Sequence, residues 1–335
     1  MRYEDWLQLG LGMILLGFVL WIGTSPAPEG SIIPSAYRDS KITLLAGGDV
    51  NMGRLIGQKI LAGDVNYPFT NIADTLRGAD ITFVNLESQL ADLGGETQSP
   101  TNEYRFAGPP EGAKSLANAG IDIVSIANNH MWDYSKDALF ETIDNLEMAG
   151  VLHVGASKNM EDKYKATIIE VKNQKVAFLA MTTLLNGYER FAQDYVSFNN
   201  EEEIVKEIRR IRDDVDYLFV SIHTGTEYKL TPDKLMEQLS HRFIDEGADG
   251  VIGHHPHVPQ PIEMYNEKPI LYSLGNFAFW QPFSFETQHS YLAELVLDNG
   301  TIKLNTIPIN SGWQPSLDLD ESSIRRTLSL IYPTS

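Results

Sequence analysis

Short apolar runs alternate with helical periodicities through most of the chain. The runs are too brief for helices and predict strands. Between them, apolar residues recur every three or four positions, as on one face of a helix. Strands that alternate with helices favour an α/β fold whose parallel or mixed sheet is covered on both faces. The expected strands are Lys41–Gly48, Ile81–Asn85, Ile121–Ala127, Tyr217–Ile222 and Gly250–Ile252.

Three amphipathic helices are predicted in the intervals. Ser135 is the expected cap of the first helix and Gly150 its expected end. Thr231-Pro232 is expected to open the third, because proline suits a first helical turn. The residues expected to face inward are Leu139, Ile143 and Leu146, then Ile204, Ile208 and Ile211, then Leu235, Leu239 and Phe243.

The last third of the chain predicts consecutive strands instead. Tyr291–Leu297 and Thr301–Ile309 flank an Asp298-Asn299-Gly300 turn, which indicates a hairpin, and Pro269–Ser273 precedes them. A second regularity is an aspartate directly before four of the strands. This repeat is typical of a βα sheet and by itself carries no chemistry. It occurs at Ala79-Asp80, Ile121-Asp122, Val215-Asp216 and Ala248-Asp249.

The N-terminal segment predicts a membrane anchor. No charged residue occurs from Trp6 to Pro28, and Leu7–Ile22 would span roughly 24 Å as a helix. A cleaved signal peptide is the alternative, but Glu4 and Asp5 dilute the positive charge and no A-x-A site follows. We therefore expect a single-pass anchor at residues 1–24, a linker at 25–40, and one domain at 41–335 that lies outside the cytoplasm, with localisation at the cell membrane.

Composition and charge exclude several classes of function. The 335 residues include 26 basic and 45 acidic ones, a formal charge of −19, so the basic footprint of a nucleic-acid-binding protein is missing. The chain has no cysteine, which excludes disulfides, thiolate metal ligands and cysteine nucleophiles.

Metal-ligand side chains follow five of the predicted strands. The carboxyl ends of parallel strands meet at one edge of a sheet, where α/β folds bind ligands. Oxygen and imidazole ligands without sulfur suit a one- or two-metal hydrolytic centre. Any one of these segments alone is more simply explained as a turn, a helix cap or a core histidine; their joint occurrence favours a metal site. The segments are Gly47-Gly48-Asp49-Val50-Asn51, Asn85-Leu86-Glu87, Asn128-Asn129-His130, His223 and Gly253-His254-His255-Pro256-His257.

The spacing of the last two histidines gives a further prediction. In an extended segment, side chains two positions apart point to the same side. We therefore expect His255 and His257 to lie on one side of the chain, each able to reach a different metal ion.

Six motifs resemble those of the CapA/PgsA family of capsule and poly-γ-glutamate synthesis proteins. That family is similar in fold to calcineurin-like metallophosphoesterases, so the resemblance implies a layered fold of mixed sheets with flanking helices. It extends from about Lys41 to Ile309. The motifs are GGDVNMGR (47–54), VNLES (84–88), SIANNHMWDY (125–134), SIHTGTEY (221–228), GHHPHVPQPIE (253–263) and YSLGNFAF (272–279).

The resemblance implies a role for individual residues. His130 would protonate a leaving group, and Arg54 and Arg105 would hold an anionic substrate group. The implied metal ligands are Asp49, Glu87, Asn129, His223, His255 and His257. Further residues of the motifs whose roles stay open are Asn51, which stands where such enzymes often have histidine, and Asn85, His254, Glu227, Glu263 and Asn276.

The chain also departs from the family pattern. Thr224 stands where tryptophan is usual, Ser135 stands where glycine is usual, and Asp49 and Glu87 are the only carboxylates at the implied metal ligands. The implied cofactor is therefore one or two divalent ions of Mn, Fe, Zn or Mg.

Three functions remain open at this point. The resemblance implies synthesis or export of poly-γ-glutamate or a related anionic capsule polymer, with an amide ligase and small membrane subunits as partners. The −19 charge would repel such a polymer at long range. The alternatives are a free-standing metal-dependent hydrolase of phosphoesters or of peptide amides, and a metal-binding scaffold without turnover.

Overall fold

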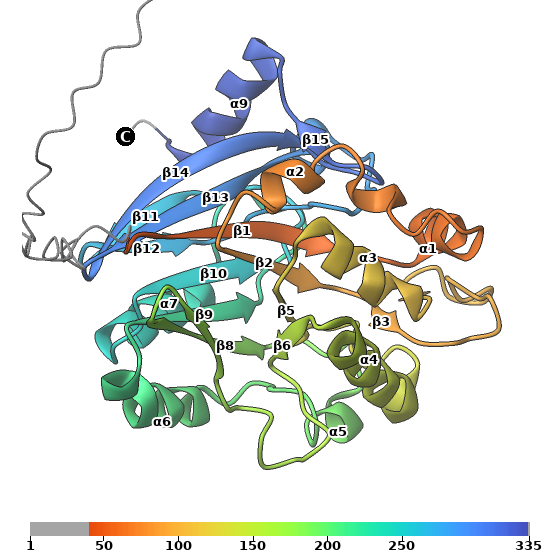
Figure 1. Cartoon of the computed structure of the whole chain (residues 1–335), viewed down its shortest axis with the longest axis horizontal. Helices are drawn as coiled ribbons and strands as arrows, with labels where there is room; N and C mark the ends of the chain where they lie inside the picture. The colour runs from red at the N-terminus through yellow and green to blue at the C-terminus, as the bar shows by residue number, and fades with distance from the viewer. Residues whose placement is uncertain (1–39, 334–335) are drawn as a thin grey trace, which may run out of the picture. The chain divides into compact units, whose positions relative to one another are not determined.

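The computed structural model describes residues 40–333, which belong to one compact unit, and shows the predicted mixed α/β architecture with flanking helices (Figure 1). The predicted anchor, residues 1–24, and the predicted linker up to residue 39 lie outside the described residues. Within residues 40–333, no helix is both long and apolar enough to cross a membrane.

Seven strands of the described chain form the first sheet. Its centre is parallel, because β1, β2, β5 and β6 run in one direction. The C-terminal hairpin adds to it in antiparallel fashion beside β1. In spatial order the strands are β15 (Ser316–Leu317), β14 (Thr301–Asn310), β13 (His289–Asp298), β1 (Ile42–Val50), β2 (Ile81–Leu86), β5 (Ile123–Ser125) and β6 (Leu152–Val154).

Six strands form the second sheet, and a two-stranded ribbon completes the sheets of the described residues. In the second sheet β8, β9, β10 and β12 are parallel, and both edge strands are antiparallel to their neighbours. The order is β11 (Ile262–Tyr265), β12 (Lys268–Leu271), β10 (Gly250–His254), β9 (Tyr217–His223), β8 (Gln174–Thr182) and β7 (Thr167–Val171). The ribbon pairs β3 (Gln89–Leu90) with β4 (Ala107–Gly108).

The helices of the described residues are mostly short and surround the sheets. They are α1 (Arg54–Leu61), η2 (Tyr67–Phe69), α2 (Ala73–Leu76), α3 (Glu111–Ala119), α4 (Ser135–Ala149), α5 (Glu189–Ala192), α6 (Glu201–Ile211), η3 (Arg212–Asp214), α7 (Lys234–Asp245), α8 (Phe285–Gln288) and α9 (Glu321–Ile331).

The two sheets pack against each other and helices cover their outer faces. Between the sheets, the Phe83 ring of β2 stacks on Phe178 of β8 at 5.4 Å, and Phe178 stacks on Phe219 of β9 at 5.9 Å. A second apolar cluster joins the first sheet to α1, α3 and α4, and a third joins the second sheet to α6 and α7. Figure 1 shows these helices beside the strands that they cover. The result is a four-layered arrangement, helix–sheet–sheet–helix.

The helix predictions hold with three corrections. Thr231-Pro232 does not open the third helix, because α7 begins at Lys234 with Asp233 as its N-cap residue. Gly150 ends α4 in the left-handed conformation, as expected. Ser135 does not cap that helix: it is the first helical residue, with φ of 66°, and the side chain of Gln89 fixes the start by accepting from the Tyr134 N–H at 2.7 Å. Leu235 was expected inward but is 47% exposed, because the buried stripe of α7 is centred on Met236 instead.

The predicted hairpin is present. Asp298 pairs with Thr301, so the turn has two central residues, Asn299 and Gly300. Their φ angles of 49° and 77° are both positive, as a type I′ turn requires. The strand before it, β12, joins the second sheet rather than the hairpin's sheet.

The four strand-leading aspartates each accept a hydrogen bond from a backbone N–H of a neighbouring strand. Each thereby fastens the amino end of its own strand to the strand beside it. The bonds are Thr43 N to Asp80 Oδ2 at 2.8 Å, Thr82 N to Asp122 Oδ2 at 2.8 Å, Lys175 N to Asp216 Oδ2 at 2.7 Å and Leu218 N to Asp249 Oδ2 at 2.9 Å.

Candidate metal centre

The predicted ligand residues meet where the carboxyl ends of two sheets adjoin, not at the edge of a single sheet. Asp49 ends β1 of the first sheet, and His254 ends β10 of the second. A connecting segment joins the sheets, since the Asp49 N–H donates to the Gly275 carbonyl at 3.0 Å. A Cβ on Gly48 would lie 1.9 Å from that carbonyl oxygen, so this close approach requires glycine.

Asp49 is a fully buried carboxylate that other polar groups surround. Asn85 Nδ2 donates to its Oδ1 at 2.8 Å, and ring nitrogens of His254 and His257 lie 3.3 Å from its two oxygens. Burial opposes ionisation, but the two imidazoles outweigh it and hold the pKa of Asp49 well below its usual range. Asp49 is therefore an anion in the folded protein at neutral pH.

Glu87, directly after β2, is the anomalous group of the centre. Its side chain is 0% exposed, and neither carboxylate oxygen has a hydrogen-bond partner. Its Oε1 faces three ring nitrogens: His223 Nε2 at 3.6 Å, and His130 Nε2 and His257 Nε2 at 3.8 Å each. Burial, and then the Asp49 charge, raises the pKa of Glu87 well above its usual range. An unpartnered buried carboxylate is costly unless a cation joins it.

The donor set fits a divalent metal ion. Asp49, Glu87 and His257 bring ligand atoms within 4.8 Å of one another, and so do Glu87, His223 and His255. Burial lowers the pKa of His255 to about 3, and it holds the pKa of His223 well below its usual range. Both rings are therefore neutral at pH 7, which is the form that binds metals.

A third group of ligand atoms shares members with the first two. Glu227 reaches His255 and His257 within the same limit, and Glu227 itself is exposed. The sequence motif that ends β9 thus supplies a carboxylate beyond Asp49 and Glu87. Glu227 is therefore a third carboxylate that could bind a metal ion at this centre.

Amide side chains form a layer behind the ligands. Asn128 Nδ2 donates to Asn85 Oδ1 at 3.1 Å, and Asn85 continues to Asp49. Asn129 Oδ1 lies 2.8 Å from His223 Nε2, so these two ligand-type atoms bond to each other in this structure. Asn276 Oδ1 lies 3.0 Å from His257 Nδ1, which leaves Nε2 of that ring facing Glu87.

His130 is oriented by a residue that the sequence reasoning missed. Asp133 Oδ2 lies 2.8 Å from His130 Nδ1 and also accepts the Phe106 N–H at 3.2 Å. The opposite ring nitrogen, Nε2, faces Glu87. The i, i+3 spacing of a histidine and an aspartate within one motif was the available signal for this pair.

The two predicted anion-binding arginines have different surroundings. Arg54 lies over the Phe106 ring at 4.8 Å, and its Nε is buried without a partner. Burial lowers the pKa of Arg54, and the Coulombic field of Glu87 acts in the other direction. Arg105 donates from Nε to the backbone oxygen of Asp133 at 2.8 Å, so it supports the loop that carries the His130–Asp133 pair.

The remaining motif residues divide between the centre and other parts of the fold. Asn51 Oδ1 accepts the Gly53 N–H at 2.8 Å and so shapes the turn after β1. His254 is buried beside Asp49. Glu263 lies on β11, where it bonds to His241 at 3.1 Å and to Tyr272, and no contact joins it to the ligand groups described above.

The segment that carries His255 and His257 is not extended as predicted, although the two rings do lie together, with centroids 5.9 Å apart. The φ angles of His255 and His257 are 99° and 60°, so the chain turns at both residues. Tyr228 and the first residues of α1 and α4, Arg54 and Ser135, also have positive φ. Left-handed non-glycine residues are strained and tend to cluster at functional sites.

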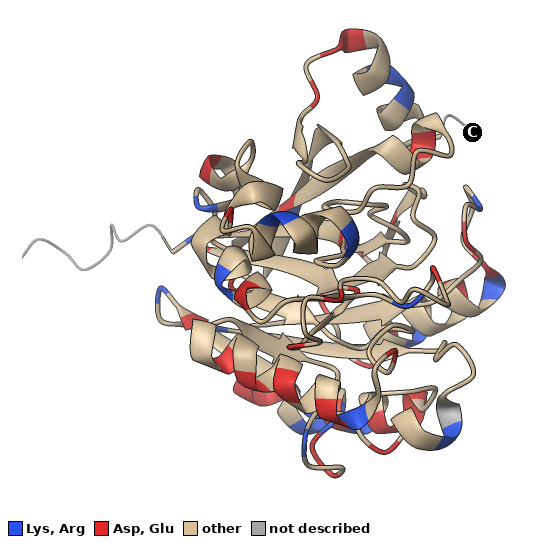
Figure 2. Cartoon of the chain, turned by 90° about the vertical axis from the view of Figure 1, so that its right-hand side faces the viewer, with Lys and Arg blue, Asp and Glu red and all other residues tan. Residues whose placement is uncertain are grey.

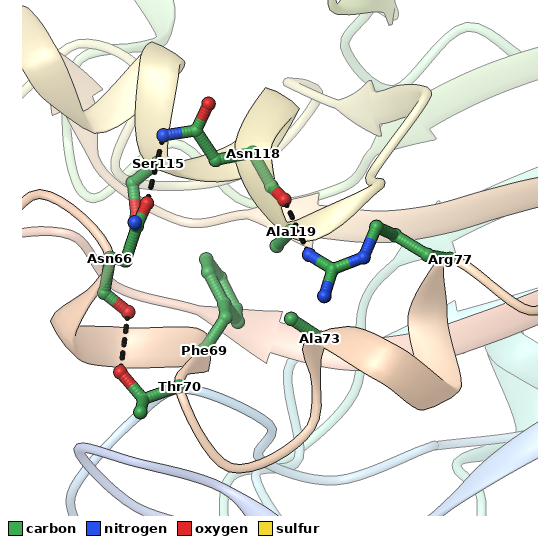
Figure 3. A pocket seen from close by; sticks show the side chains of 8 residues that line it. All are labelled: Asn66, Phe69, Thr70, Ala73, Arg77, Ser115, Asn118 and Ala119. Carbon is green, nitrogen blue, oxygen red and sulfur yellow. Dashed lines mark hydrogen bonds between the residues drawn. The ribbon is translucent and has the colours of Figure 1, made fainter.

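Other surface features lie apart from this centre. A hollow of about 220 Å³ between α2 and α3 is lined by Phe69, Arg77, Ser115 and Asn118, and no residue predicted from the sequence motifs lines it (Figure 3). There Arg77 donates to the Asn118 carbonyl at 2.9 Å. On the face drawn in Figure 2, acidic and basic residues are interspersed.

The family model described as "Bacterial capsule synthesis protein PGA_cap" matches residues 43–281, most of the described chain. The chain belongs to this family. A relative named "Capsule biosynthesis protein CapA", from Bacillus anthracis, is 30% identical over 305 residues, which cover 88% of this chain and 74% of the relative. "PGA biosynthesis protein CapA" from Bacillus subtilis (strain 168) is 28% identical, covering 89% and 78%.

Among solved structures, a putative 5'-nucleotidase from Staphylococcus aureus in complex with alpha-ketoglutarate is similar at a TM-score of 0.46. It is 14% identical and covers 87% of this chain and 58% of that chain. At this score nothing about chemistry follows from the likeness. Membership of the PGA_cap family agrees with the resemblance seen in the six sequence motifs, and it places the chain among proteins of capsule biosynthesis.

Proposed function

We propose that this PGA_cap family member acts in the synthesis or export of poly-γ-glutamate or a related anionic capsule polymer, and that a divalent metal centre serves a hydrolytic step on that polymer. The printed names of the Bacillus relatives support the biological role. On this proposal residues 1–24 anchor the chain, its bulk lies outside the cytoplasm, and an amide ligase and small membrane subunits are its partners.

The unpartnered Glu87 carries the catalytic part of the proposal. A carboxylate with both oxygens buried and unbonded, facing ring nitrogens of three histidines, does not serve the stability of the fold. This is the arrangement expected of a metal ligand. Asp49, Glu87 and His257 would hold one ion, and His223 and His255, together with Glu87, a second.

The chain's own groups suit cleavage of an amide bond. A bound divalent ion supplies an activated water and a polarised carbonyl. His130 Nε2 can then give its proton to the leaving nitrogen as the carbon–nitrogen bond breaks, while Asp133 holds Nδ1 and fixes the ring. Arg54, at the same centre, offers a cation to a carboxylate of the substrate.

The test is metal content and hydrolysis measured on the full-length chain and on Asp133→Asn. The substitution keeps the shape of the side chain but removes the charge that orients His130. We expect metal content to stay unchanged and the rate of release of glutamate-containing fragments to fall about 100-fold, the usual contribution of a positioned acid or base.

Asp144→Asn is the matched control, because it makes the same change on the exposed face of α4. Its rate should equal that of the wild type. A chain that binds metal but shows equal rates in both variants would be a scaffold without turnover, and the catalytic part of the proposal would be wrong.

A further inference from the structure

A hollow beside the metal centre is lined in part by Asp133, the partner of His130. It has a volume of about 640 Å³, within the range of about 300–1,000 Å³ typical of ligand sites. Asp133 belongs both to its wall and to the metal centre, since Asp133 Oδ2 bonds to His130. A chain bound in this cavity would therefore end beside the proposed proton donor.

The cavity has polar groups of two kinds. Arg105 and Lys136 supply cations: Arg105 donates to the Asp133 carbonyl through Nε and Nη2 and keeps further N–H donors, and Lys136 is exposed. The carboxylates are Asp133 and Asp137, which formally balance the two cations.

Aromatic side chains form the rest of the wall. Trp132 lies at the base and is almost fully buried, while Tyr188 and Phe191 come from the segment around α5. Phe191 is 60% exposed, an unusual position for a phenylalanine that serves only the fold. Exposed aromatic faces offer apolar contact to the methylene groups of a ligand.

We propose that this cavity is a binding subsite for a γ-linked glutamate chain, which it leads toward the metal centre. Each repeat of such a chain has one free carboxylate, one secondary amide and two methylene groups. The cations Arg105 and Lys136 match the carboxylates, and the aromatic faces match the methylenes. This inference rests on the proposed function and specifies where its polymer binds.

The charges that line this cavity differ from the net charge of the chain. With a net charge of −19 the chain as a whole repels an anionic polymer, and the repulsion is screened by salt. A cavity whose lining is formally neutral, and whose two cations can each contact a carboxylate, is a place where the polymer can approach. Affinity at this place should therefore depend on the cavity's own cations more than on the net charge.

The test is equilibrium binding of a fluorescent γ-linked glutamate oligomer of fixed length to the full-length chain, followed by fluorescence anisotropy. Mass spectrometry checks that the oligomer stays intact. We expect Lys136→Glu to raise Kd about tenfold or more, the effect of one lost charge-assisted hydrogen bond. Phe191→Ala should raise Kd about fivefold, and because Phe191 is 60% exposed the change leaves the buried core intact.

Lys303→Glu is the matched control, since it makes the same change of net charge at an exposed position of β14, away from the cavity. We expect its Kd to stay within about twofold of the wild type, against the larger change that one lost charge-assisted contact gives. If Lys136→Glu and Lys303→Glu weaken binding equally, or if neither does, the cavity is not the subsite although the polymer still binds, and the proposed function survives.

Two other results separate the remaining possibilities. If the wild type does not bind the oligomer at all, the proposed polymer function itself is wrong. If an α-linked glutamate oligomer of equal length and charge binds as tightly and with the same sensitivity to Lys136→Glu, the cavity recognises acidic peptides in general, and the assignment to γ-linked chains is wrong.

Discussion

The two ends of the parallel strands use carboxylates in opposite ways. At the amino ends, Asp80, Asp122, Asp216 and Asp249 each accept a backbone N–H of the adjacent strand at 2.7–2.9 Å. At the carboxyl ends, Glu87 is fully buried and neither oxygen has a partner. The same residue chemistry, on the same strands, is satisfied at one end and left open at the other.

The contrast separates structural from functional carboxylates without reference to any relative. A satisfied acceptor lowers the free energy of the fold, whereas an unsatisfied buried charge raises it. Two residues with left-handed backbone conformation, His255 and His257, also lie near the carboxyl ends of the strands. Changes at the amino ends should therefore affect stability alone, and changes at the carboxyl ends should affect metal binding first.

The largest effect is expected for Asp49→Ala. It removes a carboxylate that contacts two imidazoles, so we expect metal affinity to fall by more than about 100-fold, beyond the effect usual for residues behind the ligands. Metal titration of the chelator-treated full-length chain measures it. Unchanged affinity would show that the ion, if any, binds elsewhere.

Asp249→Ala should show the opposite behaviour at the other end of the strands. Asp249 accepts from Leu218 N and pairs with Arg212 and Lys268 at 2.6 Å each. Its loss leaves three donors without their acceptor, and we expect the free energy of unfolding to fall by about 2–3 kcal/mol. Denaturant titration measures this, and metal affinity per folded molecule should not change. Weaker metal binding by Asp249→Ala would show that the carboxylates at the two ends of the strands do not have separate roles.

Asn276→Ala tests the amide layer behind the ligands. The side chain bonds to His257 Nδ1 and is held in turn by Gln281, at 3.1 Å. Loss of such a support usually weakens metal binding about 10- to 100-fold. Asn305→Ala, on β14, is a control for amide removal at a distance, because its partner is Glu294. Equal affinities in the two variants would exclude an orienting role for Asn276.

The smallest effect is a pH dependence at His153, outside the centre. Burial lowers the pKa of His153, so the folded protein keeps this ring neutral while the unfolded chain protonates near its ordinary pKa of about 6.5. Stability is therefore fully present above that pH and is lost as pH falls toward the folded-state pKa. The loss is at most about 1.4 kcal/mol per pH unit.

His153→Gln should remove this contribution, so its unfolding free energy should decline less between pH 7 and pH 5. Denaturant titrations at both pH values, with chelator present, give the comparison. Parallel declines in the two proteins would mean that His153 does not contribute to acid sensitivity.

Local sequence patterns predicted much of the fold but not its division into two sheets. The alternation of short apolar runs with amphipathic segments predicted the strands and helices, and Asn299-Gly300 predicted the hairpin turn. The pairing of β1 with β13 joins segments far apart in the chain, and no local pattern records such a pairing. For the same reason, β9 and β10 were expected on the same sheet as β1.

The centre was predictable where polar residues directly follow strands. Asp49, Glu87, His223 and His257 lie at or within three residues of a strand's carboxyl end, and the structure brings all four together. The role of Asp133 was not predicted, because its contact with His130 depends on the path of a loop. Glu263 was predicted as a possible site residue, but its motif continues into a different part of the fold, where it bonds to His241. The local geometry of His255 and His257 was mispredicted because backbone turns at both residues have no signal in an H-x-H spacing.

Glu87→Gln gives the most direct test of the central claim that the open carboxylate exists for a cation. The measurement is the unfolding free energy of wild type and variant, each with chelator and with added Mn²⁺. We predict that without metal the variant is at least as stable as the wild type, because ionisation of Glu87 is opposed by its burial and by Asp49, and that Mn²⁺ stabilises only the wild type. A variant that is less stable than the wild type in chelator, and a wild type that Mn²⁺ does not stabilise, would contradict the account.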